Sequence, residues 1–192
     1  KTFTIGGGVD LERFKVEGER AEVGLEKPII LCVSALVFYK RVDLAIKAVA
    51  KLENGGLLVI GDGYEKENLE TLGGKLLGSK RFKILKVPYS EIDKYYRSAD
   101  VFTLPSKSSE AFGIVYLEAM ATGIPVVAPN DEVRREVVNG AGILVNVENI
   151  KEYAEGFKKA LVKIWGETPR KQAAKFSWNK ICRKYKDALT KL

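Results

Sequence analysis

Two glutamates with seven residues between them, Glu110 and Glu118, are the residues in this sequence that most clearly point to chemistry. They bracket an otherwise apolar stretch, and an unpaired carboxylate on an apolar face is costly in free energy. A ligand that offers hydroxyl groups, such as a sugar or a ribose, would be a suitable partner. The alternative is a first-turn capping acid at Glu110 and an exposed helix residue at Glu118. A third interpretation is the carboxylate pair of a retaining glycoside hydrolase, about 5 Å apart, but such pairs normally face each other from separate elements.

The segment between the two glutamates has the features of a phosphate site. Phe112, Gly113 and Ile114 open the helix that we expect over 112–122. The first N–H groups of a helix lack partners within the helix, and its dipole is positive at this end, so anions bind there. Gly113 would let a phosphate come close to the backbone.

Two cations, Lys40 and Arg41, stand between an expected strand and the helix that follows it. They could hold a diphosphate, with Arg41 making bidentate contacts and Lys40 acting as a point charge. A solvated pair at a helix start is the alternative. A cation at this end opposes the helix dipole, so we expect an anion nearby.

The turn Gly61-Asp62-Gly63 also follows an expected strand. It could let a ligand approach the backbone, or it could be an ordinary turn between a strand and a helix. It is not a dinucleotide-binding fingerprint, because the third glycine is missing.

The elements that must position these residues alternate between strands and helices. Near-continuous apolar runs predict strands that are buried on both faces. Strands are expected at 29–33, 57–60, 82–85, 101–105, 125–129 and 143–145. Helices are expected at 42–52, 64–77 (with an interruption at Gly73-Gly74), 90–97 (with Ser90 as N-cap), 112–122, 150–165 and 178–189. This alternation predicts an α/β fold with a Rossmann-like parallel six-stranded sheet and helices on both faces. Ligands should bind at the carboxyl ends of the strands.

Composition narrows the class of protein. The 192 residues fit one domain, and the net charge of +7 comes from lysines spread along the chain rather than clustered. That spread, without interleaved aromatic residues, argues against nucleic-acid binding but is compatible with peripheral contact at the inner face of a membrane. Histidine is absent, which excludes any His triad or His metal site from the chain.

Cys32 and Cys182 are expected to be separate reduced thiols in a cytoplasmic protein. Few thermolabile residues and many charges indicate a thermophilic source, and the missing initiator Met indicates a fragment or a processed chain.

Taken together, these motifs resemble the C-terminal, nucleotide-sugar-binding half of retaining GT-B glycosyltransferases of the family-four type. That family includes mannosyltransferases, sucrose and glycogen synthases, and lipopolysaccharide glycosyltransferases, and the spacing of the two glutamates is its hallmark. The resemblance covers most of the chain. The matching segments are 8–14, 40–46, 61–63, 105–106, 110–113, 118–121, 123, 125–128, 135–138, 140–144 and 176–178.

The resemblance implies a role for each matching residue. Glu110 would accept hydrogen bonds from the donor sugar, and Glu118 from the ribose of the nucleotide. The backbone of 112–114 would bind the phosphates, Lys40 would neutralise the departing diphosphate, and the base would lie around Val87, Pro88 and Tyr89. The resemblance implies a GDP- or UDP-sugar as donor and no divalent metal for the chemistry. It also implies one donor-binding domain over 1–192, with 1–14 as the linker by which the chain enters it and 177–192 as a terminal helix. The acceptor-binding N-terminal domain would be absent from this chain, so the isolated domain would be inactive.

One departure from the family keeps other functions open. The family carries an Arg about five residues before the phosphate-binding Lys, and Ala35 stands there in this sequence. Arg41 would be a partial substitute. A nucleotide-sugar-binding module without catalysis, and a GT-B sugar-nucleotide epimerase or phosphorylase, are therefore the alternatives to a glycosyltransferase.

Overall fold

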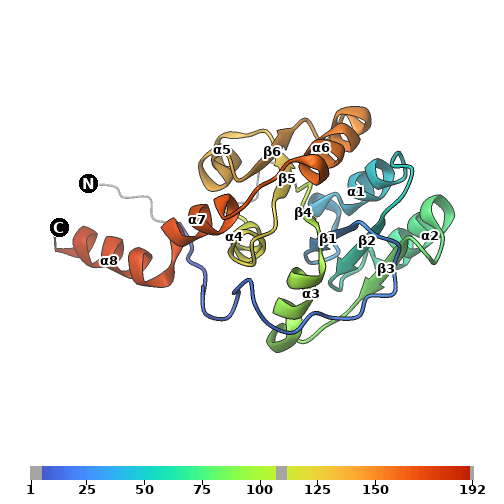
Figure 1. The fold of residues 1–192 in the computed structure, drawn as a ribbon. Helices are drawn as coiled ribbons and strands as arrows, with labels where there is room; N and C mark the ends of the chain where they lie inside the picture. The colour runs from blue at the N-terminus through green and yellow to red at the C-terminus, as the bar shows by residue number, and fades with distance from the viewer. Residues whose placement is uncertain (1–5, 107–111, 191–192) are drawn as a thin grey trace.

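The computed structural model describes residues 6–106 and 112–190, and within them it shows the predicted α/β architecture (Figure 1). Six parallel strands form one sheet in the order β3-β2-β1-β4-β5-β6. The strands are β1 (Ile29–Val33), β2 (Gly56–Ile60), β3 (Phe82–Leu85), β4 (Val101–Thr103), β5 (Val126–Pro129) and β6 (Gly142–Val145). The chain starts in the middle of the sheet, runs to one edge, and returns to build the other half outward from β4. The carboxyl ends of β1 and β4 therefore flank a switch point, where ligands bind in doubly wound sheets.

Helices cover both faces of the sheet, as right-handed crossovers require. On one face, α1 (Val42–Val49) packs against both α2 (Lys66–Leu77) and α6 (Ile150–Val162). On the other face, α4 (Ile114–Ala121) packs against α3 (Ile92–Ser98), α5 (Glu132–Val138) and α7 (Thr168–Ala173). Short 3-10 turns η1 (Phe38–Lys40), η2 (Tyr89–Glu91) and η3 (Ala174–Phe176) precede α1, α3 and the terminal helix α8 (Trp178–Leu189).

The central strands form where the sequence is continuously apolar. Every residue of β1 and β2 is buried, because helices cover both faces of the sheet there. Cys32 lies in this core, and burial raises the pKa of its thiol to about 12. Cys182 is an exposed free thiol on α8.

Several predicted boundaries are corrected by local backbone geometry. The fourth helix starts at Ile114 rather than at residue 112, because Gly113 adopts a left-handed conformation with φ 77°. Helix α2 runs through Gly73-Gly74 without a break. Gly73 is required there by close packing, since a Cβ at this position would lie 2.2 Å from the Phe82 ring. Ser90 is not an N-cap, because it falls inside η2 and α3 starts at Ile92.

Two helices were missed by the sequence patterns. Helix α5 begins at a standard cap, with the Asp131 side chain accepting a hydrogen bond from the Arg134 N–H at 3.0 Å. Helix α7 has Pro169 in its first turn, a position that proline favours. Both helices are short, so their apolar periodicity is weak.

The two ends of the described chain meet on one side of the domain. Val9 forms a parallel bridge with Ser177, and its N–H donates to the Phe176 carbonyl at 2.9 Å. Phe14 is buried in the core, so the described part of 1–14 is packed on the domain. Helix α8 projects from the body of the domain (Figure 1), with Ile181 as its buried residue. Within the described residues, no helix has both the length and the apolar character needed to cross a bilayer.

Candidate functional site

A cavity of about 520 Å³ lies at the switch point of the sheet. It is formed by the end of β1 and the turn after it, the end of β4, and the first turn of α4. Its lining residues are Val33, Ser34, Ala35, Tyr39, Lys40, Leu104, Phe112, Gly113, Ile114 and Val115. The structure thus brings together four of the predicted site residues, which are Lys40, Phe112, Gly113 and Ile114.

The α4 side of this cavity presents the start of a helix. Gly113 precedes the first turn in a left-handed conformation that glycine adopts without steric cost, and no side chain of the described residues caps the helix. The Tyr116 hydroxyl donates to the Leu104 carbonyl, which ties the helix to the end of β4. The first turn of the helix is therefore fixed at the edge of the cavity, and the free N–H groups of a helix start can bind an anion.

The opposite wall supplies the cation. Lys40 ends the 3-10 turn η1, and its ammonium group lies 5.3 Å from the centre of the Tyr39 ring. Ala35, the position at which the resemblance implies an arginine, lines the same cavity. Among the described residues that line this cavity, Lys40 alone carries a positive charge.

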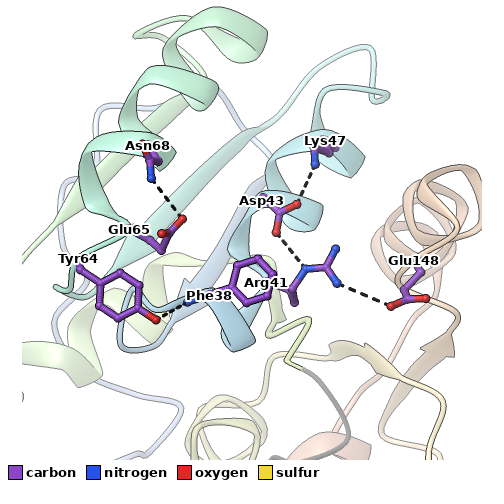
Figure 2. Close-up of polar contacts among 8 residues, drawn as sticks. All are labelled: Phe38, Arg41, Asp43, Lys47, Tyr64, Glu65, Asn68 and Glu148. Carbon is purple, nitrogen blue, oxygen red and sulfur yellow. Dashed lines mark hydrogen bonds and ion pairs between the residues drawn. The ribbon is translucent and has the colours of Figure 1, made fainter.

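Arg41 does not line the cavity that contains Lys40, although the two residues are adjacent in sequence. Its guanidinium pairs with Asp43 at 3.3 Å and approaches Glu148 at 3.7 Å (Figure 2). Asp43 also accepts a hydrogen bond from Lys47 at 2.8 Å. The carboxylates of Asp43 and Glu148 thus provide the anion that was expected beside the helix start. Arg41 is not in the lining of the cavity that contains Lys40, and its binding of the donor stays a prediction.

The divergence of these two side chains follows from the backbone of Arg41. Its φ of 52° is in the left-handed region, which is uncommon for a residue with a side chain. We expect the unfolding free energy of the Arg41→Gly variant to be about 1 kcal/mol higher than that of the Arg41→Ala variant. Both variants lose the ion pairs with Asp43 and Glu148, but only glycine relieves the backbone strain. Urea unfolding measures the difference, and equal stabilities of the two variants would contradict this account.

The turn Gly61-Asp62-Gly63 supports the wall of the cavity from behind. A Cβ on Gly61 would lie 1.8 Å from the Ser34 carbonyl oxygen, and one on Gly63 would lie 2.4 Å from that of Leu36. The Leu36 N–H donates to the Asp62 carbonyl at 2.8 Å. Packing against the segment after β1 therefore accounts for both glycines, and contact of this turn with a donor stays a prediction.

Asp62 already has a partner in the structure. Its carboxylate accepts a hydrogen bond from Lys86 at 2.6 Å, which lowers the pKa of Asp62. Val87, predicted to lie near the base, follows β3 and is partly buried. Glu110 lies outside the described residues.

Glu118 is buried, with 4% of its surface exposed, so its interpretation as an exposed helix residue is wrong. One carboxylate oxygen, Oε2, accepts a hydrogen bond from Tyr96 at 2.7 Å, and Oε1 accepts one from Tyr89 at 3.0 Å. Burial raises the pKa of Glu118, and the two tyrosine hydrogen bonds and the charge of Arg13 oppose this rise. Glu118 is not part of the lining of the cavity that contains Lys40.

A second cavity, of about 660 Å³, lies at the carboxyl ends of β5 and β6 and is lined partly by Arg41 and Ser106. Beneath it the buried Arg134 donates to the Ser106 hydroxyl at 3.1 Å and pairs with Asp131 at 3.4 Å. Arg134 and Tyr96 are not among the residues predicted for the site, and Tyr89 is predicted to lie near the base rather than beside Glu118, because these partners are set by tertiary packing. Among the residues whose placement is described, no cluster of three or more potential ligands is arranged to hold a metal ion.

The fold and the cavity together define a class of protein. The structure is similar to that of sucrose-phosphate synthase from Thermosynechococcus elongatus, with a TM-score of 0.83 and 25% identity over 97% of this chain and 51% of that one. It is also similar to Anabaena Alr3699/HepE in complex with UDP and glucose, with a TM-score of 0.79 and 21% identity, covering 98% of this chain and 56% of that one. The domain is thus a Rossmann-like α/β domain of the kind found in GT-B glycosyltransferases.

Residues 16–175 match the family described as "Glycosyl transferases group 1", and the chain belongs to that family. A GDP-mannose-dependent α-(1-6)-phosphatidylinositol monomannoside mannosyltransferase of Mycobacterium tuberculosis is 29% identical over 174 residues, which are 81% of this chain and 45% of that protein. The chain spans about half the length, or less, of the relatives that it matches.

Proposed function

We propose that this chain is the donor-binding domain of a retaining glycosyltransferase. The whole protein would transfer a hexose, such as mannose or glucose, from a nucleotide-diphosphate sugar to an acceptor held by a separate N-terminal domain. The observation that carries this proposal is the cavity at the switch point, which is lined by both Lys40 and the first turn of α4. A cation and a helix N-terminus in one cavity are suited to a diphosphate.

Each wall of the cavity has a separate part in the proposed chemistry. Lys40 and the N–H groups of 113–115 stabilise the negative charge that develops on the diphosphate as the sugar departs. Glu118 accepts hydrogen bonds from the ribose, and Glu110 from the sugar. The GDP-mannose dependence of the mycobacterial relative and the UDP in the Anabaena structure support a nucleotide sugar as donor.

A binding module without catalysis is the second candidate function. Ala35 lines the cavity where the family carries an arginine, so one phosphate cation is missing from the wall beside Lys40. A whole protein that binds nucleotide sugars but transfers no sugar, with Ala35→Arg not restoring turnover, would fit this candidate. Glycosyl transfer by the unaltered whole protein would exclude it.

Calorimetry with UDP, GDP and ADP, and with uridine, guanosine and adenosine, tests the donor site. We expect at least one diphosphate to bind, with Lys40→Ala weakening its binding about tenfold and leaving nucleoside binding unchanged. Lys47→Ala removes the same charge from α1, where Lys47 pairs with Asp43, and is expected to have no effect. Absence of binding by every diphosphate at millimolar concentration would contradict the proposal.

A further inference from the structure

The carboxylate of Glu118 is held by two tyrosines that differ in their freedom to move. Tyr96, on α3, has none of its surface exposed and donates to Oε2. Tyr89, in the 3-10 turn η2, is 59% exposed and donates to Oε1. The hydrogen bond to Oε2 therefore comes from a fully buried tyrosine, and the hydrogen bond to Oε1 comes from a tyrosine that is largely exposed.

Tyr96 is fixed by aromatic neighbours. Its ring meets Phe14 edge-on at 5.6 Å between centroids, and lies 5.7 Å from the ring of Phe102. Close packing leaves such a ring no alternative rotamer. The hydrogen bond from Tyr96 consequently sets the orientation of the Glu118 carboxylate.

Tyr89 packs against fewer core residues than Tyr96: its ring lies near that of Phe14, at 6.4 Å between centroids, and also contacts Arg13. The Arg13 guanidinium lies 3.8 Å above the centre of its ring and also donates to the Tyr89 carbonyl. Because Glu118 is 4% exposed, a ribose hydroxyl reaches its carboxylate only if a covering side chain moves. Of the two tyrosines, Tyr89 is the one that can rotate into solvent.

We propose that the two tyrosines act on nucleotide binding in opposite directions. Tyr96 is a positioning residue that holds Glu118 ready for the ribose, whereas the Tyr89 hydroxyl competes with the ribose for Oε1 and is displaced by it. A site whose competent conformation is only partly populated binds its ligand more weakly by that fraction. This inference rests on the proposed donor-binding function and goes further by naming the residues that tune it.

The charges around Glu118 make pH a second readout. The groups that face it are Tyr96 from α3, Tyr89 from η2 and Arg13 from the segment before Phe14, while Asp10 acts on Tyr89. Burial raises the pKa of Glu118, and the hydrogen bond from Tyr96 is the largest of the influences that lower it. Removing the Tyr96 hydroxyl raises the pKa of Glu118 further, so the carboxylate becomes protonated at a higher pH. The affinity for a ribose that needs the ionised carboxylate would then be lost at a higher pH during acidification.

Calorimetry with UDP and GDP on the unaltered chain and three variants, from pH 5 to pH 8, tests the inference. Tyr96→Phe is expected to weaken binding about tenfold at pH 7 and to move the loss of affinity on acidification to higher pH. Tyr89→Phe is expected to tighten binding about threefold. Tyr95→Phe removes a partly buried hydroxyl from the same helix as Tyr96 and is the control, with no change expected.

Weaker binding by Tyr89→Phe, or an unchanged affinity and pH profile for Tyr96→Phe, would overturn the inference while leaving the donor site intact. Failure of the unaltered chain to bind UDP, GDP and also ADP would overturn the proposed function together with this inference. Because Tyr89 lies on the surface, its variant decides the question even if Tyr96→Phe proves too unstable to measure.

Discussion

Glu118→Gln is expected to weaken nucleotide binding by at least about a hundredfold and, at neutral pH, to make the fold more stable. The ribose hydroxyls would lose a charged acceptor, and hydrogen bonds to charged groups are the stronger ones. The amide keeps the shape of the carboxyl group, and the hydroxyls of Tyr89 and Tyr96 can rotate to donate or accept. The site would therefore remain filled and hydrogen-bonded without a buried charge.

The sign of the stability change follows from the pKa. Burial raises the pKa of Glu118 in the folded chain, so the folded state holds this proton more tightly than the unfolded state does. The stabilisation from this group is complete below the unfolded pKa and is lost as pH rises through the folded pKa. Glu118→Gln removes this loss. The difference in unfolding free energy between the two proteins should therefore grow as pH rises from the unfolded pKa to the folded pKa, and stay constant above it.

Urea unfolding between pH 4 and pH 8, paired with calorimetry, measures both effects. The exposed acid Glu136, on α5, offers a matched substitution, and Glu136→Gln should change neither quantity. A Glu118→Gln protein that binds nucleotide normally would show that the ribose is held elsewhere. An unaltered dependence of stability on pH would show that the buried charge is not costly.

Gly61→Ala is expected to destabilise the fold by about 3 kcal/mol, the upper part of the usual range for overpacking. The added Cβ would lie 1.8 Å from the Ser34 carbonyl oxygen, a backbone atom that cannot rotate away. The segment after β1 would have to shift, and with it the wall that contains Ala35 and Lys40. Nucleotide binding should therefore weaken along with stability.

Gly74→Ala is the matched control for this substitution. A Cβ on Gly74 would have nothing within 4 Å, and the residue lies in the interior of α2. Alanine there should stabilise the helix by about 1 kcal/mol. Chemical denaturation of both variants measures the contrast, and two substitutions of equal effect would contradict the packing account of Gly61.

The sheet was predictable because its strands are buried on both faces. A short, uninterrupted apolar run such as 29–33 is typical of a strand buried on both faces. The structure confirms all six strands and their parallel arrangement. The α4 end of the site was also predictable, because it depends on a local feature, a glycine just before an apolar helix. The structure confirms that Gly113 and Lys40 line one cavity.

The remainder of the site depends on backbone turns and distant partners, which a sequence pattern does not contain. Lys40 and Arg41 separate because Arg41 takes a left-handed conformation that propensity would assign to glycine. The partners of Glu118 come from positions 22 and 29 residues earlier in the chain. Their position was fixed only when α3 and η2 packed against α4.

The bridge between Val9 and Ser177 has a mechanical consequence. Tension applied to the chain ahead of Val9 and beyond Ser177 would load the backbone hydrogen bonds of this bridge first, such as that from the Val9 N–H to the Phe176 carbonyl. All six strands of the sheet lie between Val9 and Ser177 in the sequence. The sheet would therefore bear no load until the bridge broke. The domain can thus transmit a pull from one flanking segment to the other while the strands that frame its cavity keep their register.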